Sequence, residues 1–100
     1  MNAKKNKKIN VKPKSSKIYV LLRPDTEEFL VKQRETIFGF TTEWGKHPRS
    51  AQNWKNIHQA RSWGMMLSSR KSIEIHVCSV VDLGEQYRVE TESTFFPPLV

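Results

Sequence analysis

The chain has 100 residues, a net charge of +7 and 37% hydrophobic residues, which is enough for one small domain with a modest core. Its single cysteine, Cys78, excludes an intramolecular disulfide and is typical of a reducing compartment. No apolar run approaches the roughly 18 residues that cross a bilayer, and no apolar segment follows the first lysines as in a secretory signal. We therefore expect a cytoplasmic protein, without a cofactor.

All of the net charge lies in the first 17 residues, which contain seven lysines and no acid, whereas residues 18–100 contain equal numbers of cations and acids. This composition predicts a disordered basic arm over residues 1–16. Because lysines are not buried, the arm is expected to contact an anionic partner. Nucleic acid is favoured over a membrane, since the arm has no aromatic anchor or acylation signal. The predicted contacts are Lys4, Lys5, Lys7, Lys8, Lys12, Lys14 and Lys17.

Three strands are predicted in the first half of the chain after this arm. Residues 18–22 are apolar at every position, which indicates a central strand that is buried on both faces. A turn at residues 23–26 leads to an antiparallel strand at residues 29–33. The β-branched and aromatic residues 36–42 predict a third strand, in which Gly39 indicates a bulge or a close backbone approach.

Residues 43–56 are predicted to be irregular and to be followed by a helix. Asn56 is the favoured N-cap, and a start at Ser50 is the alternative. Residues 68–71 end the helix with cations that suit its C-terminal dipole. Helical spacing predicts the buried side as Ile57, Ala60, Gly64 and Leu67.

Two strands and a hydrophobic tail complete the predicted domain. Residues 73–81 form a fourth strand, a loop covers residues 82–85, and a fifth strand follows at residues 87–91. The expected fold is α+β, an antiparallel sheet in the order β-β-β-α-β-β packed by one helix, within a single domain over residues 17–94. The segment 95–100 either covers the sheet edge, which we favour, or docks on a partner.

The middle of the chain combines cations with aromatic residues. Residues 44–73 contain six Lys or Arg residues and no acid, together with all three tryptophans. Cations that contact phosphates and aromatic rings that stack on bases are typical of nucleic-acid-binding proteins. Trp54 and Trp63 are expected in the core, and Trp44 in an exposed loop. The predicted binding residues of this segment are Trp44, Lys46, Arg49, Lys55, His58, Arg61, Arg70 and Lys71.

The sequence predicts neither a metal site nor an enzyme. His76 and Cys78 share one strand face, but the chain has no CxxC or HxxxH motif. A cysteine in the middle of a strand is normally an inert small hydrophobe. An enzyme that combines Cys78 with His47, His58 or His76 is the remaining alternative.

Short motifs follow one another over residues 17–70. They are Lys17-Ile18-Tyr19-Val20-Leu21, Phe29-Leu30-Val31, Thr36-Ile37-Phe38-Gly39-Phe40-Thr41-Thr42, Ala51-x-x-Trp54 and a helix with Ala60 and Trp63. This plan resembles small accessory proteins of phages and prophages. The resemblance implies a protein that binds host machinery, including defence nucleases and their nucleic acids, and it transfers no catalytic residue.

The favoured hypothesis is therefore a non-enzymatic protein that binds nucleic acid or a nucleoprotein complex. If the resemblance holds, its outcome is inhibition of host machinery such as a defence nuclease complex, with a host protein as a further partner. The alternative is a protein-interaction or structural module whose arm only increases solubility or binds RNA without specificity. A dimer through an exposed strand edge is left open.

Overall fold

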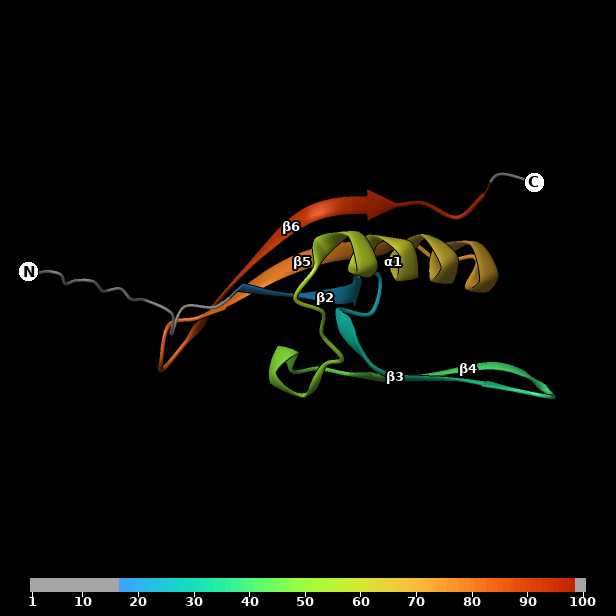
Figure 1. Cartoon of the computed structure of the whole chain (residues 1–100), viewed down its shortest axis with the longest axis horizontal. Helices are drawn as coiled ribbons and strands as arrows, with labels where there is room; N and C mark the ends of the chain where they lie inside the picture. The colour runs from blue at the N-terminus through green and yellow to red at the C-terminus, as the bar shows by residue number, and fades with distance from the viewer. Residues whose placement is uncertain (1–16, 99–100) are drawn as a thin grey trace, which may run out of the picture.

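A computed structural model describes residues 17–98 of the chain. In this part, five antiparallel strands form one sheet and one α-helix packs on it (Figure 1), which confirms the predicted α+β fold and its element order. The predicted arm, residues 1–16, lies outside the described residues. The elements are β2 (Lys17–Arg23), β3 (Glu28–Thr36), β4 (Gly39–Gly45), the 3-10 turn η3 (Pro48–Ser50), α1 (Ile57–Lys71), β5 (Ile75–Asp82) and β6 (Tyr87–Phe95).

Strand β2 lies at the centre of the sheet, whose order is β4-β3-β2-β5-β6. It pairs with β5 at six positions but with β3 at only two. Leu21 belongs to the core under α1, whereas Val20 belongs to a second core on the other face of the sheet. The prediction of a central strand that is buried on both faces is therefore confirmed.

Helix α1 begins and ends as its sequence predicts. The side chain of Asn56 accepts a hydrogen bond from the backbone N–H of His58 at 2.7 Å, so Asn56 is the N-cap. The alternative start is excluded because Ser50 belongs to η3. After Lys71 the backbone enters the left-handed region at Ser72, which ends the helix.

Gly64 allows α1 to approach the sheet closely. A Cβ atom at this position would lie 3.2 Å from Val77 and 3.3 Å from both Leu21 and Phe95. These are side chains of three different strands. The intrinsic cost of glycine within a helix, about 1 kcal/mol, is therefore offset by the close contact between helix and sheet.

The connection between β4 and α1 passes through the sheet. Beyond their two paired positions β2 and β3 separate, and residues 52–54 lie between them. The backbone N–H of Gln52 donates to the carbonyl of Leu30 on β3, and Trp54 forms an antiparallel bridge with Tyr19 on β2. The chain thus crosses from η3, on one side of β2, to α1 on the other side (Figure 1).

The bounds predicted for the third strand, residues 36–42, are wrong. Strand β3 continues to Thr36, Ile37 and Phe38 form a turn, and β4 runs from Gly39 to Gly45. Two local features allow this turn. The Thr36 hydroxyl bonds to the backbone of the turn, and Gly39 adopts a φ of +132° that other residues rarely reach. The turn was not predicted because the residues on both sides of Gly39 favour strands.

Strands β5 and β6 differ from their predicted bounds at the ends. Strand β5 begins at Ile75 rather than at residue 73, and β6 continues to Phe95, which packs against the core under α1. The C-terminal segment therefore begins by covering the core. Phe96, the next residue, is 67% exposed.

Candidate nucleic-acid interface

The described part of the chain begins beside the start of α1. Lys17 is the first residue of β2 and is exposed. Two residues later, Tyr19 and Trp54 exchange backbone hydrogen bonds of 2.8 and 2.9 Å. Because this bridge is antiparallel, it directs the beginning of β2 toward Lys55 and the first turn of α1. The six other lysines of the predicted arm lie outside the described residues.

The exposed side of α1 is polar and contains no acid. His58, Arg61, Ser62, Met65 and Ser69 are exposed on the side opposite the predicted buried residues. The N-terminal end of a helix also carries a partial positive charge. Lys55, His58 and Arg61 form no ion pair or cation–π contact within the described part of the chain. These three side chains are thus available to a phosphate group.

The two cations at the C-terminal end of α1 are already engaged. Arg70 lies 3.8 Å from a carboxylate oxygen of Glu35 and above the ring of Phe40. The Lys71 ammonium donates to the backbone carbonyl of Phe40 at 2.9 Å. Both side chains therefore connect the helix to the β3–β4 hairpin.

Trp44 does not occupy the predicted exposed loop. It lies in β4, where it pairs with Leu30, and its ring packs partly buried against the core under α1. The indole N–H donates to the Thr42 hydroxyl at 2.9 Å, and the Arg23 guanidinium lies 5.8 Å from the ring centroid. The expectation of an exposed loop was wrong because β4 continues through Gly45. Trp54 and Trp63 pack partly buried against the same core, as predicted.

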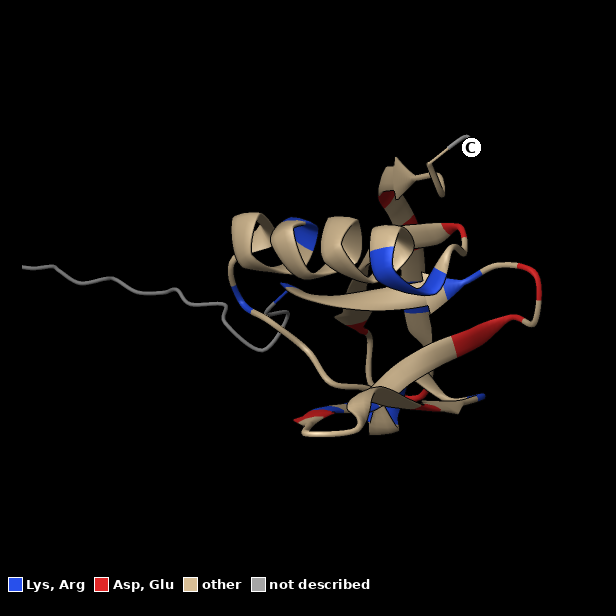
Figure 2. Ribbon diagram, turned by 90° about the vertical axis from the view of Figure 1, so that its right-hand side faces the viewer, with Lys and Arg blue, Asp and Glu red and all other residues tan. Residues whose placement is uncertain are grey.

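Lys46 and Arg49 lie apart from the exposed side of α1. The Lys46 ammonium donates to the carbonyl of Thr26 at 2.8 Å, beside the β2–β3 turn. The Arg49 guanidinium stacks on the ring of Tyr87, 4.8 Å from its centroid. The cations of the middle segment are thus distributed over several parts of the molecule (Figure 2) and do not form one continuous patch.

A polar hollow of about 390 Å³ surrounds the Arg49–Tyr87 stack. Lys17 pairs with Val81 on β5, and the next residue of β5, Asp82, pairs with Tyr87. The hollow therefore opens at the same end of the sheet as the start of β2. Its lining residues are His47, Arg49, Ser50, Glu85 and Tyr87.

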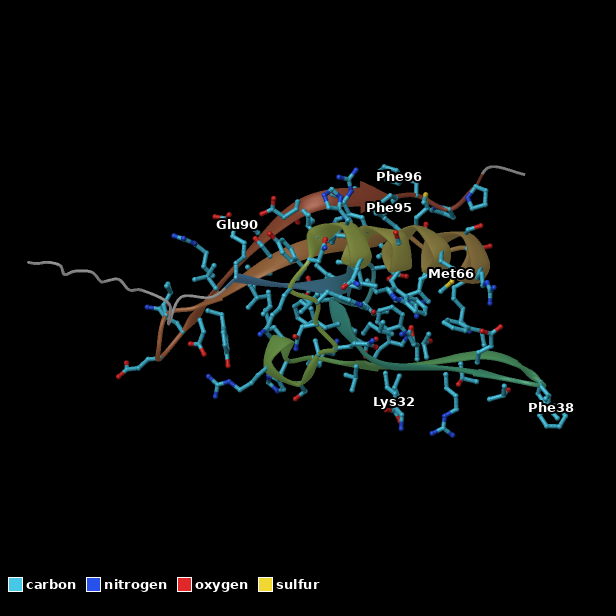
Figure 3. All side chains as sticks on the ribbon, in the orientation of Figure 1. Lys32, Phe38, Met66, Glu90, Phe95 and Phe96 are labelled. Carbon is cyan, nitrogen blue, oxygen red and sulfur yellow. The ribbon has the colours of Figure 1, made fainter. Side chains whose placement is uncertain are left out.

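The β3–β4 hairpin exposes charged and apolar side chains, a feature that was not predicted from the sequence. Lys32 and Arg34 are exposed on β3, and Ile37 and Phe38 form the exposed tip. In Figure 3 the Lys32 side chain points away from α1, and Phe38 lies at the outer end of the hairpin. The available signal was the alternation of Lys32 and Arg34 ahead of an Ile-Phe-Gly sequence.

Within the described residues, Cys78 forms no hydrogen bond with any of the three histidines considered for catalysis. Cys78 is buried, and desolvation raises the pKa of its thiol. A contact with the Thr91 hydroxyl opposes this effect in part, and the charge of Glu92 adds to it. His76 instead lies 2.7 Å from a carboxylate oxygen of Glu74. Within residues 17–98, no three His, Cys, Asp or Glu residues are placed to hold one metal ion.

Comparisons with protein-family models, with curated proteins and with solved structures found no match to this chain. The described helix is not long and apolar enough to cross a membrane.

Proposed function

We propose that the protein is a non-enzymatic nucleic-acid-binding protein whose contact surface begins at the start of β2 and continues along α1. The observation that carries this proposal is the Tyr19–Trp54 bridge. It directs the chain that follows six lysines toward the positive end of a helix whose exposed side has no acid. A phosphate backbone is the anionic partner that such a row of cations suits.

The two parts of this surface have different roles. The lysines supply attraction that does not depend on sequence, because they neutralise phosphates and release counterions. Lys55, His58 and Arg61 lie on the ordered domain, so their positions relative to one another are fixed by α1 and its N-cap. They orient the backbone of the nucleic acid along the helix.

The salt dependence of binding to a duplex tests this proposal. Six phosphate contacts predict a loss of about 10³-fold in affinity between about 50 and 200 mM salt. A full-length variant with Gln at positions 4, 5, 7, 8, 12 and 14 should lose most of that slope. Fluorescence anisotropy with a labelled duplex measures both values. A slope that this variant leaves unchanged would support the alternative, in which the arm only increases solubility.

Single substitutions on the domain provide a matched pair. Replacement of Lys55 by Gln should lower the salt slope by about 0.9, the contribution of one phosphate contact. Lys46→Gln removes the same charge from a lysine that the Thr26 carbonyl holds beside the β2–β3 turn, and should leave the slope unchanged. Equal effects of the two variants would contradict the proposed position of the surface.

A narrower proposal rests on the resemblance to phage and prophage accessory proteins. In it, the protein inhibits a host nucleic-acid-processing complex, such as a defence nuclease, by occupying its nucleic acid or the complex itself. The rate at which such a nuclease cleaves its substrate, with and without the full-length protein, tests this role. An unchanged rate at protein concentrations that saturate the nucleic acid would contradict it.

A further inference from the structure

The tip of the β3–β4 hairpin exposes two large apolar side chains. Ile37 and Phe38 are each 93% exposed, the highest values among the large hydrophobic residues of the described chain. The turn that carries them is held by Thr36, whose hydroxyl accepts from the N–H of Phe38 at 3.1 Å and donates to the carbonyl of Gly39 at 3.0 Å. The tip is therefore preorganised with its side chains in solvent.

This composition opposes the usual rules for hairpin turns. Two-residue turns favour Gly, Asn and Asp, and an exposed Ile-Phe pair adds nothing to the packing of the fold. Exposed apolar residues that a fold does not need indicate a contact with another molecule. A contact with another molecule thus explains the exposed Ile-Phe pair, which folding does not explain.

The hairpin behind the tip is narrow and polar. Residues 34–36 are exposed, and the pair next to Thr36 and Gly39 is Glu35 with Phe40. Arg34 then pairs with Thr41, and two pairs further back Lys32 pairs with Glu43. A shallow hollow of about 290 Å³ follows these positions along the hairpin. The exposed apolar contact is thus limited to one turn. Glu35, whose carboxylate lies 3.8 Å from Arg70, follows it, and Arg34 and the Thr41 hydroxyl come next.

We propose that Ile37 and Phe38 form a wedge that inserts between neighbouring base pairs of a bound duplex. This inference rests on the proposed nucleic-acid-binding function. Proteins that bend DNA insert Phe, Ile or similar side chains between base steps, which unstacks them partly. Proteins that read DNA with β-ribbons also place strands in the major or the minor groove. Arg34 and Thr41 then lie where the sugar–phosphate walls of the groove would be.

The size of the tip favours a base step over other partners. A stable protein interface buries at least about 1,000 Å² in total, and two side chains supply only part of one such surface. Firm attachment to a bilayer needs a second anchoring signal, and the exposed residues behind the tip, Arg34 and Glu35, are charged. One base step, in contrast, is filled by one or two side chains.

The test uses the full-length protein and a duplex that contains 2-aminopurine, whose fluorescence rises when the base is unstacked. Wild-type protein should raise this fluorescence. The I37S/F38S variant should abolish the rise and weaken binding about tenfold, as expected for the loss of an aromatic contact with a base. Its salt slope should not change, because no charge is removed. Leu83→Ser, at another exposed apolar loop residue, should behave as wild type.

The possible failures are distinguishable. If the wild-type protein does not bind the duplex even at low salt, the proposed function fails and the wedge fails with it. If it binds and the I37S/F38S variant gives the same fluorescence and affinity, the wedge alone is wrong. Sedimentation with phosphatidylcholine–phosphatidylserine vesicles that requires Phe38, without any change in 2-aminopurine fluorescence, would also overturn the wedge. F38A provides a second variant, and circular dichroism confirms that each variant is folded.

Discussion

Apolar side chains are buried in the part of the sheet under α1 but exposed at the tip of the β3–β4 hairpin. Under α1, Leu21, Leu67 and Val77 are fully buried in one core. At the tip, Ile37 and Phe38 are almost fully exposed on a turn that a threonine holds in place. The first region accounts for stability, and the second exposes apolar area that stability does not require. The same residue types thus form the core in one place and, in the proposal above, contact a partner in the other.

Truncation of one apolar side chain in each region should give the largest difference in the free energy of unfolding. Leu67→Ala removes a fully buried side chain from the core and should lower the free energy of unfolding by about 2–5 kcal/mol. Phe38→Ala removes a side chain that is 93% exposed and should change it by less than about 0.5 kcal/mol. Urea denaturation measures both values. A cost above about 1 kcal/mol for Phe38→Ala would mean that the tip packs on the domain.

The close contact at Gly64 should produce the next largest effect. Gly64→Val inserts three carbon atoms where a single Cβ would already lie 3.2–3.3 Å from Val77, Leu21 and Phe95. Overpacking of this kind costs about 1–3 kcal/mol. Ser62→Val, on the exposed side of the same helix, is the control, because it introduces the same β-branched residue without a steric conflict. Thermal unfolding of the two variants should therefore differ, and equal midpoints would refute the close contact.

The parts of the fold that could be predicted from sequence are those whose signals are local. Helix α1 was predictable because its signals are local: the Asn56 cap and the helical spacing of Ala60, Gly64 and Leu67. Strand β2 was predictable from its continuous apolar run. The passage of residues 52–54 between β2 and β3 was not, since it depends on two strands that are distant in sequence.

The candidate site was less predictable than the fold. The absence of acids within residues 44–73 was predictable from composition, and the exposure of His58 followed from helical spacing. The exposed tip was not predicted because the residues on both sides of Gly39 favour strands and the turn depends on one side-chain hydroxyl, that of Thr36. Trp44 was misplaced because Gly45 and Pro48 suggested a loop, although β4 continues to Gly45.

Removal of that hydroxyl should have a smaller and local effect. Thr36→Val keeps the shape of the side chain but deletes both hydrogen bonds of the turn, which should cost about 1 kcal/mol. The amide hydrogen of Phe38 should then exchange faster with solvent, as measured by nuclear magnetic resonance. Thr41→Val, which deletes a single longer bond of 3.4 Å to the Arg34 carbonyl, is the matched control. If Thr36→Val leaves the exchange rate of the Phe38 amide unchanged, Thr36 does not hold the turn.

The smallest expected effect concerns pH and tests the burial of the sheet directly. Burial raises the pKa of the Cys78 thiol above its ordinary value of 9.0, so the folded protein keeps the thiol neutral at a pH where the unfolded chain ionises it. The unfolded state then binds fewer protons, and stability falls as pH rises above 9.0. The fall has a limit of about 1.4 kcal/mol per pH unit and ends above the folded pKa.

Denaturation of wild type and Cys78→Ala between about pH 8 and about pH 10 isolates this contribution. All other side chains are common to both proteins, so the difference between the two curves belongs to the thiol. Cys78→Ala should be less stable throughout, because it leaves a cavity, but its stability should decline less steeply at high pH. Parallel curves would mean that the thiol reaches solvent in the folded state, and that the second core, around Val20 and Cys78, is more open than the core under α1.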